Sequence, residues 1–399
     1  MRNYAKVANL IIFSLLVLIS AVADLSAQPE GDILVLGETA RLYSDILKEE
    51  RQLLVYMPIG YETAQGNFPV MFLLDGSTHF HHVSGICNFL TRQNLMPPTL
   101  IVALINTDRT RDFTPSKDES REYGELPTAG RADTFLAFFE QELIPFVEKN
   151  YRTQPHRTLV GHSLGGLFAI NKIKKKPELF DAYIAISPTF WWDDEILRRK
   201  AKRYFRQNQP LEKFLYMSLG DEGRRMQTAA ERFIEYFESE APEELDWQLV
   251  SMSAETHGTT PHLTVYRGLL SLYRNWHLPE GALDSSLAFV ESHYNKLSRR
   301  YGYEIQIPER TINVMGYRAL GNEDFDLAVS LFKLNVEKYP HSANVYDSLG
   351  ECYEAMGKPG LALQNYRQAV ELGEENDDPN LPIYEDHLEK LKAQNDEDM

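Results

Sequence analysis

The sequence Thr158–Leu167, TLVGHSLGGL, decides the fold that we expect for this chain. It opens with apolar residues that are typical of the end of a buried strand, and helical periodicity follows its glycines. Between them stands Gly-x-Ser-x-Gly, the pattern of a strained strand-to-helix turn that exposes the hydroxyl of its serine, here Ser163. Glycine is expected at Gly161 and Gly165 because a Cβ there would collide with the neighbouring strand or helix. We therefore predict that Ser163 is a nucleophile, and an ordinary turn is the alternative.

A histidine later in the chain is expected to take the proton of this serine, because such sites run in the order serine, acid, histidine. His257 fits that order, since it lies in a turn between a predicted strand and a predicted helix. His262 is the alternative, but its place at a helix start is typical of a surface or capping residue. We expect the side chain of His162, the neighbour of Ser163, to point elsewhere.

The acid that orients the histidine should follow the predicted strand Phe214–Leu219, where Asp221 and Glu222 are both candidates. We prefer Glu222, because one residue further from the strand end reaches more easily toward a histidine near a helix. Glu255 is a third candidate, but it lies too near His257 along the chain to orient its ring.

Two backbone N–H groups should stabilise the negative charge that develops on a substrate oxygen. Leu164 follows the nucleophile and supplies the first of these oxyanion-hole donors. The second should come from the turn after the predicted strand Pro69–Leu74, where Gly76 and Ser77 are the candidates.

Short apolar runs alternate with helical segments along residues 32–276, which predicts a mostly parallel sheet with helices on both faces. The candidate residues follow predicted strands, and the chemistry of such sheets collects at the carboxyl ends of their strands. The predicted strands are Asp32–Arg41, Leu42–Pro58, Pro69–Leu74, Thr99–Ile105, Leu159-Val160, Ala182–Ile186, Phe214–Leu219 and Asp246–Met252. The predicted helices are Phe80–Arg92, Thr134–Lys149, a helix from Leu164, Asp193–Phe205, Gln227–Glu238 and His262–Trp276, with a long polar loop over residues 106–131.

The composition is that of a globular protein with one large core and a smaller unit, since 43% of the 399 residues are hydrophobic. The net charge of −17 argues against nucleic acid or an anionic membrane surface as the main partner. Residues 393–399 are expected to form an acidic tail that is solvated or disordered.

The N-terminus has the order of a secretory signal peptide. Two basic residues precede an apolar run from Ala8 to Ala23, and small residues follow up to Ala27. The run has about 16 residues, fewer than the roughly 20 that span a bilayer, so we favour cleavage over an uncleaved anchor. The sequence thus predicts a signal peptide at residues 1–27, no stable membrane span after its cleavage, and a periplasmic or secreted protein.

Cysteine and histidine usage gives no sign of a metal centre. His79, His81 and His82 lie close together, but no further ligand stands at a suitable spacing. Cys87 and Cys352 are far apart and fall in different predicted domains, so two separate buried thiols are expected rather than a disulfide. The chemistry of an activated serine requires neither a metal nor an organic cofactor.

A repeat of 34 residues marks the C-terminal region: Met315-Gly316 returns as Leu349-Gly350, and Phe332 as Tyr366. These positions resemble tetratricopeptide repeats, in which small residues let two helices approach and aromatic side chains fill the gaps. A generic helical extension is the alternative. The predicted domains are residues 28–277 for the sheet domain, 278–310 for a helical linker, and 311–392 for the repeats.

Five motifs occur in an order that resembles a family of α/β-hydrolase esterases. They are Tyr56-Met57-Pro58 with Gly60-Tyr61, Leu73-Leu74-Asp75-Gly76, the Ser163 motif, Ile186-Ser187-Pro188 and Thr256-His257-Gly258. The family includes siderophore esterases, feruloyl and acetyl-xylan esterases, S-formylglutathione hydrolases and mycolyltransferases. The resemblance covers roughly residues 32–276, and it implies an α/β-hydrolase fold and a serine esterase for a small-molecule ester.

Similarity to the iron-siderophore branch of this family extends to two segments on its substrate side. They are Asn106–Pro115, with Arg109 and Arg111, and the pair Trp191 and Trp192. The arginines could bind an acidic or catecholate substrate through paired hydrogen bonds, or form internal ion pairs with the neighbouring aspartates. The tryptophans could wall an aromatic pocket or belong to the core.

We therefore expect an exported serine esterase that acts on siderophore, phenolic or acetyl-sugar esters. An acyltransferase on the same site, with a sugar or lipid hydroxyl in place of water, is the first alternative. The second is a protein-binding module, in which the repeats hold a protein partner and the hydrolase domain is an inactive scaffold.

Overall fold

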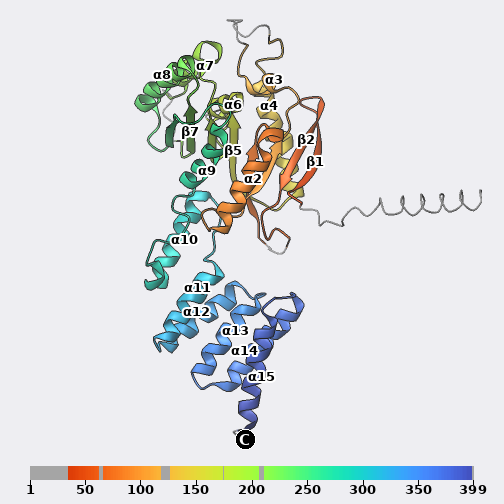
Figure 1. Ribbon diagram of the computed structural model, residues 1–399, viewed down its shortest axis with the longest axis vertical. Coiled ribbons are helices and arrows are strands. Elements are labelled where there is room, and N and C mark those ends of the chain that lie inside the picture. The colour runs from red at the N-terminus through yellow and green to blue at the C-terminus, as the bar shows by residue number, and fades with distance from the viewer. Residues whose placement is uncertain (1–34, 63–65, 118–125, 174, 206–210, 398–399) are drawn as a thin grey trace, which may run out of the picture. The chain divides into compact units, whose positions relative to one another are not determined.

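The computed structural model of this chain describes residues 35–62, 66–117, 126–173, 175–205 and 211–397 (Figure 1). Contacts divide the chain into a unit of residues 1–38 and a unit of residues 39–399. The predicted signal peptide, residues 1–27, lies outside the described residues. Among the helices of the described ranges, none combines the length and the apolar character that a membrane crossing needs.

One sheet of eight strands organises the first part of the described chain. Its strands are β1 (Glu38–Ser44), β2 (Glu49–Tyr56), β3 (Phe68–Leu73), β4 (Leu100–Leu104), β5 (Thr153–His162), β6 (Ala182–Ile186), β7 (Phe214–Gly220) and β8 (Asp246–Met252). The helices along this part are α2 (Gly76–Arg92), α3 (Arg109–Phe113), α4 (Ala132–Phe138), α5 (Ile144–Asn150), α6 (Leu164–Lys172), α7 (Trp192–Phe205), α8 (Arg224–Glu240) and α9 (Thr260–Leu272). A π-helical segment, η2 (Phe139–Leu143), joins α4 to α5.

The strand order is β1-β2-β4-β3-β5-β6-β7-β8, with β2 antiparallel to β4 and parallel pairing from β4 through β8. The direction of travel across the sheet therefore reverses between the β3-α2-β4 and β5-α6-β6 units. Because both crossovers are expected to be right-handed, α2 covers one face and α6 the other. α9 packs beside α2. Ligand sites form at such a reversal, beyond the carboxyl ends of the strands, which here are those of β3 and β5. The predicted mostly parallel sheet with helices on both faces is confirmed.

Aromatic side chains fill the core on the α6 side of the sheet. The ring of Phe135 lies 5.2 Å from that of Phe139 and 5.4 Å from that of Phe168, between ring centroids. All three side chains are buried, and burying a side chain of this size contributes about 2–3 kcal/mol to folding. This packing gives a rigid base to the turns at the strand ends.

The structure corrects three of the predicted boundaries. The first two strands are separated by a turn at residues 45–48, where Lys48 has φ 57°, so the predicted boundary at Arg41 is wrong. The predicted loop at residues 106–131 contains α3, which Asp108 caps by accepting a hydrogen bond from the Arg111 N–H. The helix predicted at Thr134–Lys149 is three segments, because the π-helical turn of η2 interrupts its α-helical pattern.

From residue 282 to residue 397, every regular element that the structure describes is helical (Figure 1). A 3-10 turn, η3 (Ala282–Asp284), precedes α10 (Leu287–Tyr301), α11 (Glu309–Gly321), α12 (Phe325–Lys338), α13 (Ala343–Ala355), α14 (Pro359–Glu375) and α15 (Leu381–Glu397). α11 packs on α12, α13 on α14, and α14 on α15. Gly316 lies against the ring of Phe332 and Gly350 against that of Tyr366, while the tetratricopeptide character of these helices stays a prediction. Residues 393–397 continue α15, so the expected tail is helical there.

Candidate active site

Ser163 stands at the strained turn between β5 and α6, with φ 59° and ψ −114°. An L-residue adopts such a conformation only where the surroundings hold it, and here the Ser163 N–H donates to the Ile186 carbonyl at 2.8 Å. A Cβ on Gly161 would collide with the Gly165 carbonyl, which explains that glycine. At Gly165 the expected collision is absent, because a Cβ there would meet the Leu74 side chain at an ordinary 3.4 Å.

Glu222 and His257 form a hydrogen-bonded pair at the ends of β7 and β8. His257 Nδ1 lies 2.8 Å from Glu222 Oε2, and the Glu222 side chain is only 3% exposed. Its other oxygen accepts from the Ser187 hydroxyl and from the Gly220 N–H at 3.0 Å. Burial acts to raise the pKa of Glu222, but the hydrogen bonds from His257, Ser187 and Gly220 outweigh it and the pKa is lowered. Glu222 is thus held as a carboxylate that can orient an imidazole.

One cavity of about 280 Å³ brings the nucleophile candidate together with this pair. The cavity is lined by Ser163, Thr189, Trp191, Glu222, Arg225, Met226 and His257. Ser163 Oγ also lies 3.5 Å from the Thr189 hydroxyl. A serine, a histidine and a buried carboxylate are the residue types that acyl transfer requires, and here they line one cavity.

The other acid and base candidates point elsewhere. Asp221 is exposed, and its N–H donates to the Glu255 carbonyl at 2.7 Å. Glu255 contributes that carbonyl rather than its carboxylate. The ring of His262 lies 5.5 Å from that of His82, between centroids, and His262 is absent from the cavity lining.

The oxyanion-hole candidates lie at helix N-termini, where backbone N–H groups have no partner within the helix. Leu164 is the first residue of α6, and Gly76 and Ser77 begin α2. Asp75 precedes α2 with φ 56°, which turns the chain sharply at the end of β3. The same edge of the sheet therefore carries all three donors, although their role stays a prediction.

A model of the family described as "Putative esterase" matches residues 44–246, just over half of the chain. The chain belongs to this esterase family. The matched range contains Ser163 and Glu222 with the strands that carry them, while the turn with His257 lies beyond it.

Two curated relatives are named as siderophore esterases. Ferri-bacillibactin esterase BesA of Bacillus subtilis is 30% identical over 167 residues, which are 36% of this chain and 57% of that protein. The siderophore enterobactin esterase of Emericella nidulans is 40% identical over 105 residues, which are 24% of this chain and 35% of that protein. The chain thus aligns with little more than half the length of the first and about a third of the second.

Two solved structures are similar over longer ranges. An IroE-like serine hydrolase from Shewanella oneidensis has a TM-score of 0.67 and 26% identity, over 75% of this chain and 99% of that one. This likeness confirms the predicted α/β-hydrolase fold. An uncharacterised protein from Capnocytophaga ochracea has a TM-score of 0.62 and 17% identity, over 89% of this chain and 99% of that one, and it shares the fold.

Arg109 and Arg111, the two candidates for substrate binding in this family member, both form ion pairs within the protein. Arg109 donates from Nε to Asp75 Oδ1 at 2.7 Å and from Nη2 to the His162 carbonyl at 2.9 Å. Arg111 donates to Glu49 at 2.6 Å and to Asp112 at 2.8 Å. The geometry favours the internal ion-pair alternative for both, with Asp75 rather than a neighbouring aspartate as the partner of Arg109.

In this esterase family member, one of the two tryptophans belongs to the core and the other lines the cavity. Trp192 is 2% exposed and donates its indole N–H to the Ser116 carbonyl at 3.2 Å, so it belongs to the core. Trp191 lines the cavity of Ser163, and the Arg225 guanidinium lies 4.6 Å from the centroid of its ring.

His162 does not line the cavity of Ser163, in line with the expectation that it points elsewhere, but its ring contacts that of His257, which was not expected. The centroid of its ring lies 4.5 Å from that of His257 and 5.5 Å from that of His79 on α2. His162 is the last residue of β5, and its ring contacts both His79 of α2 and His257 of the turn after β8.

Sequence reasoning missed four residues around the site. Ser187 supports the acid, and Thr189, Arg225 and Met226 complete the cavity lining. Ser187 stands in a motif that was noted only for the family resemblance. The other three lie several residues beyond a strand end, and no motif in the sequence identifies them.

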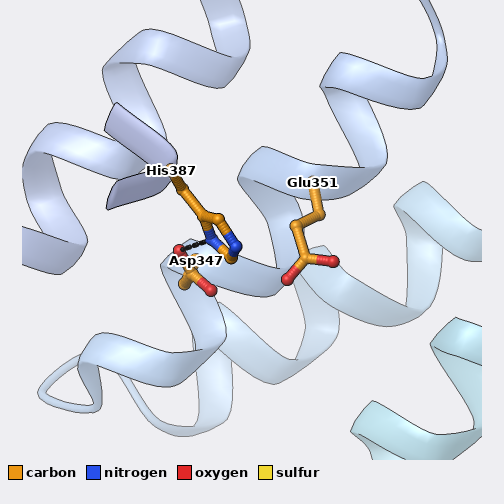
Figure 2. A group of neighbouring side chains, drawn as sticks. All are labelled: Asp347, Glu351 and His387. Carbon is orange, nitrogen blue, oxygen red and sulfur yellow. Dashed lines mark hydrogen bonds and ion pairs between the residues drawn. The ribbon is translucent and has the colours of Figure 1, made fainter. Parts of the chain in front are cut away.

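Among the described residues, one group of side chains has ligand atoms close enough to hold a metal ion, and it lies outside this site (Figure 2). Asp347 and Glu351 lie one turn apart on α13, His387 reaches them from α15, and the three ligand atoms lie within 4.8 Å of one another. His387 Nδ1 lies 3.0 Å from Asp347 Oδ1, and the Tyr317 hydroxyl donates to Glu351 Oε1 at 3.0 Å. Because these bonds satisfy the group within the protein, we assign no metal to it.

Proposed function

We propose that this protein is an exported serine esterase in which Ser163 attacks the carbonyl carbon of a small-molecule ester. The observation that carries the proposal is the cavity that Ser163 shares with the bonded pair of His257 and Glu222. A histidine held by a carboxylate at Nδ1 keeps Nε2 for the proton of the serine.

The proposed reaction has two steps. His257 Nε2 takes the Ser163 proton as Oγ bonds to the ester carbonyl, and the N–H groups of Leu164 and of Gly76 or Ser77 stabilise the oxyanion. The tetrahedral species collapses, the leaving alcohol receives the proton from His257, and an acyl-enzyme remains. Water then gives a proton to His257, attacks the acyl carbon and releases the acid, which restores Ser163.

Hydrolysis of p-nitrophenyl esters by the mature protein tests this proposal, with Ser163→Ala and His257→Ala beside the wild type. Each variant should lose roughly 10³- to 10⁶-fold in kcat/KM. Labelling by a fluorophosphonate should disappear in Ser163→Ala and persist in Ser330→Ala, an exposed serine of α12. A wild type inert to every ester and phosphonate, or full activity in Ser163→Ala, would contradict the proposal. Product analysis with added alcohols separates hydrolysis from acyl transfer.

The substrate that we propose is a siderophore ester or a related phenolic ester. Trp191 and Arg225 both line the cavity, and the Arg225 guanidinium lies over the Trp191 ring. An aromatic ring beside a cation suits a flat, anionic group. The names of the relatives, as siderophore esterases, point to the same class.

Replacement of Arg225 tests this substrate class. Arg225→Gln should raise KM about 5- to 30-fold for an iron-siderophore ester, which corresponds to about 1–2 kcal/mol of lost binding. The KM for a short aliphatic ester should stay within about twofold. Arg224→Gln is the matched control, because this exposed neighbour does not line the cavity. Equal changes for both esters would remove Arg225 from substrate selection.

Export belongs to the same proposal and rests on the signal-peptide pattern of residues 1–27. Expression in a bacterial host should give a periplasmic or secreted protein whose mass corresponds to an N-terminus at Gln28. An uncleaved chain retained with the cells would contradict this part without affecting the triad.

A further inference from the structure

Five histidine side chains form a row that leads away from the candidate active site. Between ring centroids, His257 lies 4.5 Å from His162, and His162 lies 5.5 Å from His79. His79 Nδ1 lies 3.0 Å from His82 Nε2, and the ring of His82 lies 5.5 Å from that of His262. These residues come from four separate places: the turn after β8, the end of β5, α2 and the start of α9.

His162 is held more firmly than the His257 ring that it contacts. It pairs with Ile186 in the sheet, and its carbonyl accepts a hydrogen bond from Arg109 at 2.9 Å. His257 lies on a turn, its side chain is 41% exposed, and its Nδ1 bonds to Glu222. The side-chain torsions and the bond to Glu222 still leave the His257 ring room to tilt. The plane of the His162 ring is inclined by 40° to it, so the two rings touch without stacking, and this contact restricts the tilt from one side.

The surroundings keep His162 uncharged. Burial, followed by the neighbouring His257 and His79, lowers the pKa of His162 to about 4. Arg109 lowers that pKa further, and Asp75 opposes the shift. Charge matters here, because His257 becomes a cation when it takes the serine proton, and a second cation at 4.5 Å would oppose that step.

The other members of the row give His162 a stable backing. Burial lowers the pKa of His79, and burial with the neighbouring His79 and His262 lowers the pKa of His82 to about 4. His79 is 6% exposed and lies on α2, which packs beside α9. The row therefore ties the end of β5 to two helices, and burial favours the uncharged form of His162, the member that contacts His257.

We propose that His162 is a positioning residue, whose neutral imidazole forms the wall that holds the His257 ring with Nε2 toward Ser163. His79, His82 and His262 support this wall from behind. The inference rests on the proposed esterase function and goes beyond it, because it assigns a role to a residue that takes part in no bond making or breaking.

Kinetic measurements on two variants of His162 distinguish a positioning role from a contact without effect on catalysis. His162→Ala removes the ring and should lower kcat about 10- to 100-fold, with KM within about twofold, because the base is misplaced while the cavity stays intact. His162→Phe keeps a flat, uncharged ring and should restore kcat to within about threefold of the wild type. His81→Ala is the control, since this exposed histidine of α2 lies outside the row. Thermal unfolding checks that each variant is folded, and His162→Leu replaces the alanine variant if that one does not fold.

Proton NMR of histidine-labelled protein tests the wall without any ester. The Nδ1 proton of His257, shared with Glu222, should give a resolved downfield resonance in the wild type, in His162→Phe and in Ser163→Ala. It should broaden or disappear in His162→Ala. If the wild type shows no esterase activity, the proposed function is contradicted. The resonance still tests whether His162 positions His257.

Two results would overturn the positioning role. One is a folded His162→Ala variant with kcat within twofold of the wild type and an unchanged His257 resonance. The other is an equal loss in the alanine and phenylalanine variants, which would show that a flat ring at this position does not hold the base.

Discussion

Glu222 receives three hydrogen bonds at the end of β7, whereas its neighbour Asp221 is exposed to solvent. The side chains of the two acids differ in the direction in which they point more than in how far they extend. The N–H of Asp221 is bonded to the Glu255 carbonyl, and this bond turns the next side chain toward His257. Local backbone bonding thus separates two acids that the sequence distinguishes only by their distance from the strand end.

Replacement of each acid by its amide tests this difference. Glu222→Gln should lower kcat/KM by roughly 10³- to 10⁴-fold, because an amide neither stabilises the imidazolium nor fixes its tautomer. Asp221→Asn should stay within about threefold of the wild type. Ester hydrolysis by the three proteins decides the assignment, and a larger loss in Asp221→Asn would reverse it.

At the residue scale, candidates could be named from the sequence where their order along the chain and their place after a strand identify them. Ser163, His257 and Glu222 each follow a strand, and their order along the chain restricts their roles. The contact of His162 with His257 could not be predicted, because it depends on which face of the sheet the end of β5 presents. Arg225 was missed for a similar reason, since only the position of α8 brings it over Trp191.

At the scale of elements, the turn between β5 and α6 depends on close backbone approach at Gly161. Gly161→Ala would drive a Cβ into the Gly165 carbonyl, so the turn must open. We expect a loss of stability of more than about 4 kcal/mol or failure to fold. Denaturant unfolding measures it. Gly85→Ala on α2 is the control, because a Cβ there meets no atom within 4 Å, and equal stability of the two variants would contradict the argument.

Helix α15 is held to α13 by the contact of His387 with Asp347 (Figure 2). Burial acts to lower the pKa of His387, but the hydrogen bond and charge of Asp347 outweigh it and the pKa is raised above 6.5. A base with a raised pKa contributes stability that is present below pH 6.5 and is lost as the pH rises through its folded-state pKa. Burial also raises the pKa of Asp347, so at acid pH the contribution ends where that carboxylate takes up a proton.

His387→Ala should therefore destabilise the protein by about 1–3 kcal/mol at pH 6, because Asp347 stays buried without its partner. The difference should shrink as the pH rises above the folded-state pKa of His387. Thermal unfolding across this pH range measures it, with the exposed His341→Ala as control. A difference that grows with pH would show that the charge of His387 does not hold α15.

Most elements of the sheet region were predictable because they are short, buried apolar runs. Ala182–Ile186 is such a run and matches β6 at both ends. Asp246–Met252 matches β8 at both ends although this strand is mostly half-buried. The turn before β2 was missed, because Lys48 adopts a positive φ without a glycine or a proline to mark it. α3 was missed because five residues are too few to show a helical period.

At the scale of the whole molecule, the reversal of strand order between β3 and β5 explains where the candidate site lies. The alternation of strands and helices predicted a mostly parallel sheet, but it does not contain the order of the strands. The site residues named from the sequence follow β3, β4, β5, β6, β7 and β8, and the fold brings four of them, Ser163, Trp191, Glu222 and His257, to one cavity. None of them belongs to α10–α15, and the role of those helices stays open to experiment.

The close approach of α13 to α14 offers a way to perturb the helical region without touching the site. A Cβ on Gly350 would meet the Tyr366 ring at 2.6 Å, and overpacking of this kind costs about 1–3 kcal/mol. Gly350→Ala should therefore lower the unfolding temperature, while the kcat of ester hydrolysis by Ser163 stays within about twofold at 25 °C. Gly360→Ala is the control, because a Cβ there meets no atom within 4 Å. A large loss of kcat in folded Gly350→Ala, without a loss in Gly360→Ala, would show that the helical region acts on the active site. The search for the substrate would then have to include contacts with the helical region.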